Sequence, residues 1–166
     1  MKKIIRIGTR SSELALWQAN TVSNQLNYLG HETEIVKIDS IGDEVLNKPL
    51  YELGTTGVFT KNLDVALLND KIDIAVHSLK DVPTVLAKGI VQAAVLKRGL
   101  HHDILVLKDD DKFFTEKTAT IATGSLRRKA QWLYRFPHHK ITDLRGNVNT
   151  RMRKLKENDW NGAIFA

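Results

Sequence analysis

The chain of 166 residues contains no cysteine, and this absence removes several kinds of chemistry at once. Without thiols the chain can form no disulfide, thiolate nucleophile or thiolate metal site. Its apolar runs are short and interrupted by charge, so none is long enough to cross a membrane. The opening Met1-Lys2-Lys3 leads into a short strand-like run and not into the apolar core of a signal peptide. We therefore expect a cytoplasmic protein.

Common motifs for phosphate and metal binding are also missing. The sequence has no G-x-G-x-x-G or G-x-x-x-x-G-K-[ST] stretch, which argues against a nucleotide phosphate loop. It has no H-E-x-x-H or comparable ligand spacing either. The histidine pairs 101–102 and 138–139 are adjacent in sequence, and adjacent side chains on regular elements point apart. We interpret all four as exposed loop histidines and predict no metal site.

Strand-like and helix-like segments alternate along the chain. This alternation predicts an α/β fold with largely parallel sheets flanked by helices. The predicted strands are 4–7, 33–38, 72–76, 90–96, 104–107, 119–122, 140–144 and 162–166. The predicted helices are 12–29, 60–68, 125–135 and 147–157, with a long polar loop at 39–58.

Two further expectations concern packing and domain organisation. The first helix should bury its apolar side, formed by Leu14, Trp17, Val22, Leu26 and Leu29. Residues 97–103 have the character of a crossing point between two lobes, so we predict a first domain at 1–98 and a second at 99–166.

Four clusters of hydroxyl residues and cations follow predicted strands, at residues 10–12, 77–81, 123–128 and 145–147. A cation at a helix N-terminus opposes the helix dipole, at a cost of roughly 0.3–1 kcal/mol. The backbone N–H groups at the same place favour anions. Parallel strands end at a common edge, where open α/β sheets bind their ligands. The clusters therefore predict a cleft for a ligand with several negative charges.

The net charge of +6 is concentrated near the end of the chain. Residues 127–166 carry 10 basic and 3 acidic groups, a net charge of +7. Such a segment could bind nucleic acid or a small polyanion. Trp132 and Phe136 lie among its cations, but their spacing of four is typical of an amphipathic helix whose aromatics face the core. We favour the small polyanion.

One carboxylate and several arginines are the candidates for chemistry. Asp81 lies among cations, where a carboxylate could transfer a proton or stabilise a transient cation, although it could also be a turn residue before Pro83. Arginine binds carboxylates through two parallel hydrogen bonds, although arginines can also form a solvated helix face. A plain anion-binding module would gain nothing from an acidic group beside its ligand, so Asp81 separates an enzyme from a binding module. The candidate arginines are Arg127, Arg128, Arg145 and Arg151.

Four long motifs occur in order along the whole chain. They are RIGTRSSELALWQA at 6–19, DIAVHSLKDVP at 73–83, TGSLRR at 123–128 and LRGNVNTR at 144–151. Together they resemble the porphobilinogen deaminase (hydroxymethylbilane synthase) family. The resemblance implies two lobes like those of periplasmic binding proteins, both incomplete in this chain, with the active site in the cleft between them.

The resemblance also implies an activity in tetrapyrrole and haem biosynthesis. The family condenses four porphobilinogen molecules head to tail into hydroxymethylbilane and releases ammonia at each step. It uses a dipyrromethane cofactor bound through a thioether to a cysteine of a third domain, which this chain lacks. The implied partner is porphobilinogen, with no nucleic acid or membrane, and the implied full-length protein is a monomer.

Site residues carry over position by position. Asp81 is the implied catalytic carboxylate, and Phe59 lies by the active-site loop. The residues implied to bind the acidic groups of cofactor and substrate are Arg10, Ser12, Ser78, Lys80, Thr123, Ser125, Arg127, Arg128, Arg145, Gly146, Asn147 and Arg151.

The chain departs from the family pattern in three places and in length. Thr56 replaces a usual lysine, Gly124 replaces a commoner serine or threonine, and residues 99–103 differ from an acidic-Pro-Arg-Asp stretch. These differences concern the loop and the hinge. The chain ends within a strand-like run, so we expect a fragment. Without a cysteine to retain the growing product, we expect these residues alone to be inactive.

Overall fold

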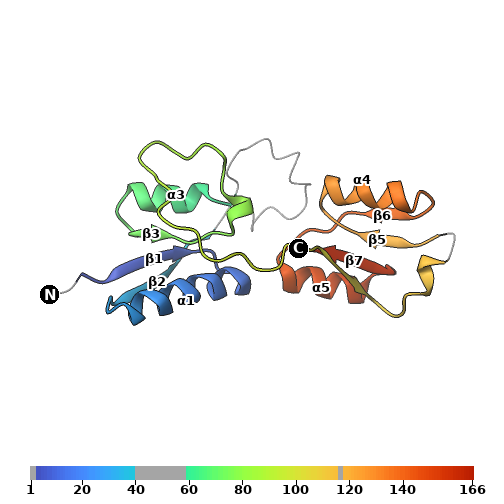
Figure 1. The fold of residues 1–166 in the computed structure, drawn as a ribbon, viewed down its shortest axis with the longest axis horizontal. Helices are drawn as coiled ribbons and strands as arrows, with labels where there is room; N and C mark the ends of the chain where they lie inside the picture. Colours follow the sequence, from blue (N-terminus) through green and yellow to red (C-terminus); the bar gives the residue numbers. More distant parts are fainter. Residues whose placement is uncertain (1–2, 40–58, 116–117) are drawn as a thin grey trace. The chain divides into compact units, whose positions relative to one another are not determined.

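The computed structural model describes residues 3–39, 59–115 and 118–166 (Figure 1). The described residues form two compact units, the first ending at Leu96 and the second beginning at Lys97. Each unit is a sheet with helices packed on it, so the predicted α/β class with largely parallel strands is confirmed. The boundary between residues 98 and 99 stays a prediction about the domains of the whole protein.

The first unit, called unit 1, has a parallel sheet in the order β2-β1-β3. Its helices lie on opposite faces of this sheet, α1 on one and α3 on the other (Figure 1). Ile7 of β1 and Leu63 of α3 are almost fully buried in this unit. The elements are β1 (Ile5–Thr9), α1 (Glu13–Tyr28), β2 (Thr33–Lys37), α3 (Lys61–Leu68), β3 (Ile74–Ala75) and the short 3₁₀ helix η2 (Leu79–Asp81).

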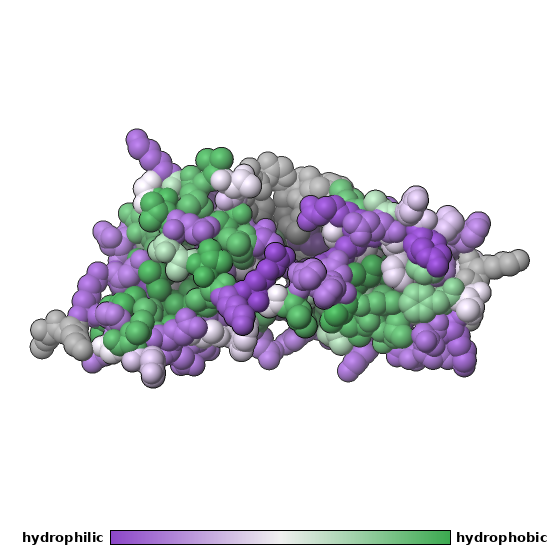
Figure 2. Space-filling view, viewed as in Figure 1, coloured by the Kyte–Doolittle hydropathy of each residue, from purple (hydrophilic) through white to green (hydrophobic). Residues whose placement is uncertain are grey.

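Helix α1 contacts its sheet through small residues. The buried ones are Ala15, Ala19 and Ser23. Because these positions are four apart, they form one face, and their small side chains let the helix lie close to the strands. The large neighbours then point away, and Trp17 is 64% exposed. The predicted apolar face is therefore wrong for Leu14, Trp17 and Leu29, which are exposed. Hydrophobic residues occur on the visible surface of both units (Figure 2).

The second unit, called unit 2, has a four-stranded sheet in the order β4-β7-β5-β6. Strands β7, β5 and β6 are parallel, whereas β4 runs antiparallel to β7, with Ile104 opposite Phe165. Helices α4 and α5 cover opposite faces (Figure 1). The elements are β4 (Ile104–Leu107), the 3₁₀ helix η3 (Lys112–Phe114), β5 (Thr120–Ala122), α4 (Leu126–Arg135), β6 (Lys140–Thr142), α5 (Val148–Glu157) and β7 (Gly162–Phe165).

Trp132 packs against the core of unit 2, as the sequence predicts, and Phe136 is half-buried beside it. Trp132 packs against Phe136, with ring centroids 4.8 Å apart. His139 is only 7% exposed and accepts a hydrogen bond at its Nδ1 from Trp132 Nε1, at 3.3 Å. The expectation of an exposed His139 is therefore wrong, because the residue lies beside β6 and stacks on Phe136. His101 and His102 are exposed as expected.

Residues 90–96 form no strand, contrary to the sequence prediction. Val91 is 81% exposed and Val95 is 58% exposed. A strand needs a neighbour to pair its backbone N–H and C=O groups, and the described residues pair none with this segment. The predicted loop at 39–58 lies outside the described residues from residue 40 onward. Within the described ranges, no helix combines the length and hydropathy needed to cross a bilayer.

Candidate active site

In each unit, the predicted clusters follow parallel strands at the carboxyl edge of the sheet. In unit 1, residues 10–12 follow β1 and residues 77–81 follow β3. In unit 2, residues 123–128 follow β5 and residues 145–147 follow β6. This edge is where open α/β sheets bind ligands. We call the two groups of site residues the unit 1 cluster and the unit 2 cluster.

Side chains of both clusters cap the helices that start there. Ser12 Oγ accepts a hydrogen bond from Ala15 N at 3.4 Å, and Ser125 Oγ accepts one from Arg128 N at the same distance. Asn147 Oδ1 accepts a hydrogen bond from Thr150 N, in the first turn of α5, at 2.9 Å. Each cap satisfies one of the N–H groups that a helix leaves unpaired at its start. The remaining N–H groups make these helix starts favourable for anions.

Arg10 and Asp81 lie together in the unit 1 cluster. The Arg10 guanidinium carbon is 4.4 Å from the centroid of the Phe59 ring, a cation–π contact. Arg10 Nη1 is 3.8 Å from Asp81 Oδ2, and the two side chains are 17% and 24% exposed. This separation is too long for a hydrogen bond. Within the described part of the chain, the Asp81 carboxylate is therefore paired electrostatically but accepts no hydrogen bond.

Other unit 1 residues support this pair or extend its charge. Ser78 Oγ donates to Gln18 Oε1 at 3.0 Å and so joins η2 to α1. Lys80 is exposed, and among the described residues it has no partner. Burial lowers the pKa of His77, against the smaller opposing effect of nearby carboxylates that include Asp81. Burial thus favours the uncharged form of this imidazole within the unit 1 cluster.

In unit 2 the loop after β6 is held rigidly. Gly146 has a φ of +113°, a conformation that favours glycine, and a Cβ there would lie 2.6 Å from Thr150 Cγ2. Arg151 Nε donates to the Gly146 carbonyl at 2.7 Å. Arg145 is only 7% exposed. The backbone of this loop is therefore fixed by its own glycine and by an arginine that the sequence assigns to ligand binding.

The loop after β5 lies against the loop after β6. Thr123 is buried, and its Oγ1 accepts from Ser125 N at 3.2 Å. A Cβ at Gly124 would lie 2.6 Å from the Leu144 carbonyl oxygen. This position is one of the three departures from the family pattern. The glycine is what allows the two loops to approach so closely.

The two neighbouring arginines at the start of α4 differ sharply. Arg128 donates from Nε and Nη2 to the two carboxylate oxygens of Asp103, each at 2.7 Å. Arg127 is exposed, and no partner for it occurs among the described residues. The sequence assigns both residues to ligand carboxylates, but only Arg127 is left fully available. The described residues also contain no group of three or more histidine, aspartate or glutamate residues placed to hold a metal.

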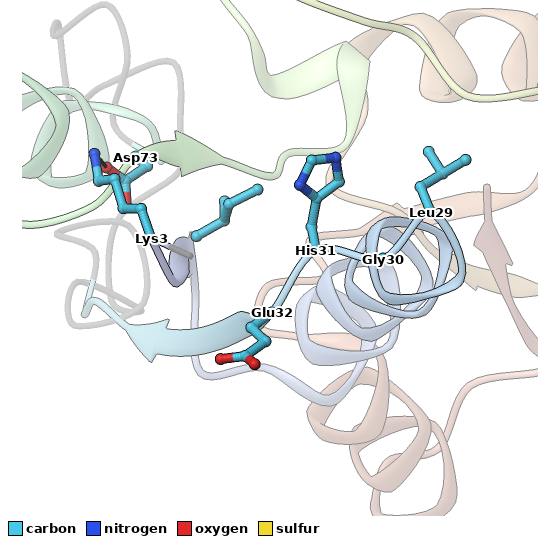
Figure 3. Close-up of a pocket in the computed structure, with 7 residues that line it drawn as sticks. Lys3, Leu29, Gly30, His31, Glu32 and Asp73 are labelled. Carbon is cyan, nitrogen blue, oxygen red and sulfur yellow. Dashed lines mark hydrogen bonds and ion pairs between the residues drawn. The ribbon is translucent and has the colours of Figure 1, made fainter. Parts of the chain in front are cut away.

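A cavity of about 460 Å³ lies at the other end of the unit 1 sheet (Figure 3). Its lining includes Lys3, His31 and Asp73, from segments that precede or begin the strands. Lys3 Nζ donates to Asp73 Oδ1 at 2.8 Å, so this pair is already satisfied. The cavity is at the amino edge of the sheet and lies apart from the clusters. We place the candidate site at the carboxyl edges, where the cations and Asp81 are.

Two residues that contact these clusters escape prediction from sequence. Asp103 is 25 residues from Arg128, and Gln18 is 60 residues from Ser78. No local pattern indicates contacts between residues so far apart in the chain. Of the three departures from the family pattern, Thr56 lies outside the described residues.

The donor set fits a group that carries several carboxylates, such as dipyrromethane. Both clusters combine cations with helix N-termini, and these are the partners that carboxylates prefer. Among the described residues, exposed Arg127 and Lys80 offer cationic donors that no acidic group of the chain occupies. Because the chain has no cysteine, a thioether to such a group cannot form within these residues.

Comparison with known proteins agrees with this chemistry. Residues 5–166 match the family model described as "Porphobilinogen deaminase, dipyromethane cofactor binding domain". A probable porphobilinogen deaminase of Methanocaldococcus jannaschii is 48% identical over 98% of this chain and 56% of its own length. The porphobilinogen deaminase of Syntrophotalea carbinolica is 45% identical over 98% of the chain and 52% of its own length. The chain thus spans about half the length of these curated relatives.

A solved structure of an ancestral cyclohexadienyl dehydratase is similar at 13% identity, with a TM-score of 0.37. The similarity covers 98% of this chain and 65% of that one, and a likeness at this level carries no functional information. The family match and the identities over nearly the whole chain are the stronger result. On these grounds, the chain belongs to the porphobilinogen deaminase family.

Proposed function

We propose that the full-length protein condenses four porphobilinogen molecules head to tail into hydroxymethylbilane and releases ammonia at each step. Family membership supports the reaction class. The observation that carries the proposal is the Asp81 carboxylate, which lies 3.8 Å from Arg10 at the carboxyl edge of its sheet and is 24% exposed. A purely anion-binding site would not place a carboxylate there, because it would repel the ligand.

In this proposal Asp81 is the catalytic residue. Its carboxylate assists the departure of the substrate amine as ammonia and stabilises the positive charge that develops on the pyrrole. Arg10 holds Asp81 in place electrostatically, and the Phe59 ring holds the Arg10 guanidinium. The carboxylate accepts no hydrogen bond in the described part of the chain and can therefore face a cationic group of the substrate.

The remaining site residues bind acidic side chains of the pyrroles. The unit 1 cluster offers Lys80 and the start of α1 at Ser12, and the unit 2 cluster offers Arg127 and the starts of α4 and α5. A covalently held dipyrromethane would supply a primer that keeps the growing chain attached through successive additions. Arg145 and Arg151 act here through the shape of their loop as well as through their charge.

The test is the turnover of porphobilinogen by the full-length protein and by its Asp81→Ala variant. Hydroxymethylbilane is measured as uroporphyrin after cyclisation and acid oxidation, and ammonia release is measured in parallel. We expect the variant to lose nearly all turnover and to keep the unfolding temperature of the wild type. Asp109→Ala, at an exposed position of unit 2, is the matched control and should behave as wild type. Retained turnover in Asp81→Ala would instead favour a plain anion-binding module.

A further inference from the structure

Asp103 reaches the candidate site because of the direction of one strand. It immediately precedes β4, which among the described strands is the antiparallel member of its sheet. In the register of this pair, Ile104 lies opposite Phe165, the last residue of β7. The start of β4 therefore lies at the carboxyl edge of the sheet. A parallel strand in the same place would bring Asp103 to the opposite edge.

At this edge Asp103 holds the Arg128 guanidinium. Arg128 donates from Nε and Nη2 to the two carboxylate oxygens at 2.7 Å each, and from Nη1 to the Ile164 carbonyl at 3.4 Å. A guanidinium has five N–H groups. After these three bonds, one N–H group on each terminal nitrogen remains for a further acceptor. Arg128 is thus fixed in orientation and still able to donate.

The pair differs from the other ion pairs described in unit 2. Lys112 with Asp110 and Arg153 with Glu157 have all four side chains more than half exposed. Exposed pairs of this kind hold their side chains weakly, because water screens them and side-chain entropy opposes a fixed geometry. The difference lies in the cation: the Arg128 side chain is only 20% exposed, whereas Asp103 is 47% exposed, and two parallel hydrogen bonds define the plane of the guanidinium. Its orientation is therefore set before any ligand binds.

We propose that Asp103 is a positioning residue of the unit 2 cluster, which presents the Arg128 guanidinium in one orientation to a carboxylate of the ligand. This inference rests on the proposed function, since the carboxylates are those of the pyrrole substrate and its growing chain. Asp103 itself does not touch the ligand. It also offsets the charge of Arg128, so recognition at this point depends on the direction of the remaining N–H groups more than on net charge.

The experiment uses the full-length protein with porphobilinogen as substrate and Asp103→Asn as the variant. Asparagine keeps the size of the side chain but can accept with only one oxygen and carries no charge. We expect the KM for porphobilinogen to rise about tenfold, as happens when a ligating residue loses the hydrogen-bond partner that orients it. The kcat should stay within a factor of about two. Asp110→Asn removes an exposed paired carboxylate of the same unit and is the matched control, with KM unchanged.

A spectroscopic readout tests the positioning without turnover. In the wild type the Arg128 Nε–H group should give an NMR signal protected from exchange with water, identified by its loss in Arg128→Lys. This protection should disappear in Asp103→Asn and persist in Asp110→Asn. If Asp103→Asn does not fold, Asp103→Glu replaces it. Because its carboxylate is one methylene further out, this variant should keep part of the protection and raise KM by a smaller factor.

Three outcomes would overturn the inference. An unchanged KM with the protected signal lost would show that the pair is only structural. A lower KM would show that Asp103 competes with the ligand for Arg128. A persistent signal in Asp103→Asn would show that Asp103 does not orient the guanidinium.

A wild-type protein without deaminase activity would reject the proposed function instead. Porphobilinogen binding by calorimetry then decides: about tenfold weaker binding to Asp103→Asn supports positioning, and equal binding overturns it.

Discussion

Each unit places an arginine beside an aspartate at the carboxyl edge of its sheet, and the two pairs differ in geometry. In unit 1, Arg10 Nη1 is 3.8 Å from Asp81 Oδ2, beyond hydrogen-bonding distance. In unit 2, Arg128 binds Asp103 through two hydrogen bonds of 2.7 Å. A carboxylate that accepts no hydrogen bond from the described residues keeps its acceptor sites for a substrate, whereas a carboxylate held by two short hydrogen bonds is suited to orienting its partner. The same two residue types thus suit catalysis in one unit and positioning in the other.

Among the variants that compare the two pairs, the largest effect should come from moving the unit 1 carboxylate without removing it. Asp81→Glu keeps the charge and lengthens the side chain by one methylene. A displacement of about 1 Å at a reacting centre can cost roughly a hundredfold in rate, and we expect a loss of that order in kcat. Asp103→Glu should lower kcat/KM by only a few fold. Steady-state assays of both variants measure the difference, and equal losses would mean that the two carboxylates have the same role.

The next effect separates the two neighbouring arginines of α4. Arg127→Leu and Arg128→Leu should each lower kcat/KM by about tenfold or more, because a charge-assisted hydrogen bond contributes roughly 1.5–3 kcal/mol. Only Arg128→Leu should also lower the free energy of unfolding, by up to about 1 kcal/mol, because it leaves Asp103 without its partner. Chemical denaturation measures this change in the free energy of unfolding. A larger stability loss in Arg127→Leu would contradict the described geometry.

A third aspartate shows what a purely structural pair looks like. Asp73, at the amino edge of the unit 1 sheet, accepts hydrogen bonds from Arg6 N, Nε and Nη2 and from Lys3 Nζ. Asp73→Asn should lower the free energy of unfolding by about 1–2 kcal/mol, because bonds to a charged acceptor are lost. The kcat of the folded protein should stay at the wild-type value. A fall in kcat would mean that the amino edge also contributes to the reaction.

The pH dependence of the same variant gives an independent check. Hydrogen bonds from Arg6 and Lys3 hold the pKa of Asp73 well below its ordinary value. A lowered pKa in the folded state adds stability that is present above the unfolded pKa of about 3.9 and is lost as the pH falls below it. The gap in unfolding free energy between wild type and Asp73→Asn should therefore shrink below about pH 4. A gap that is constant down to pH 2 would contradict this.

The smallest effect involves the histidine beside the unit 1 pair. Burial lowers the pKa of His77, so the folded protein binds a proton less readily than the unfolded chain. Stability from this group is present above the ordinary histidine pKa of about 6.5 and declines as the pH falls below it. His77→Gln should flatten the stability profile between about pH 7 and pH 5. An unchanged slope would assign that pH dependence to other groups.

What the sequence predicts well is local in the chain. Ser12, Ser125 and Asn147 cap helices where the pattern indicates, because a cap and its N–H partner are three residues apart. The cation clusters lie at strand ends as predicted, because each one follows its strand closely in the sequence. The strand predicted at 90–96 fails because alternation of side chains reports only that a strand could form. Pairing requires a neighbour, which one segment cannot encode.

The contacts that distinguish the two arginine–aspartate pairs are not local. Asp103 meets Arg128 only because β4 runs against β7, and strand direction at a sheet edge leaves no periodic signal in the sequence. His139 is buried because it stacks on Phe136 next to β6, a contact across a turn that residue type alone does not indicate. Sequence patterns therefore predict where the site lies, and the tertiary contacts decide which of its residues remain available to a ligand.

The outward-facing Trp17 of α1 has an optical consequence. The three tryptophans of the chain are Trp17, Trp132 and Trp160. Trp17 is 64% exposed in unit 1, whereas Trp132 and Trp160 pack against the two hydrophobic clusters of unit 2. Iodide in the buffer should quench Trp17 while the other two indoles keep their fluorescence. One tryptophan thus reports on unit 1 and two report on unit 2, and their emission can show whether the units unfold together or in succession.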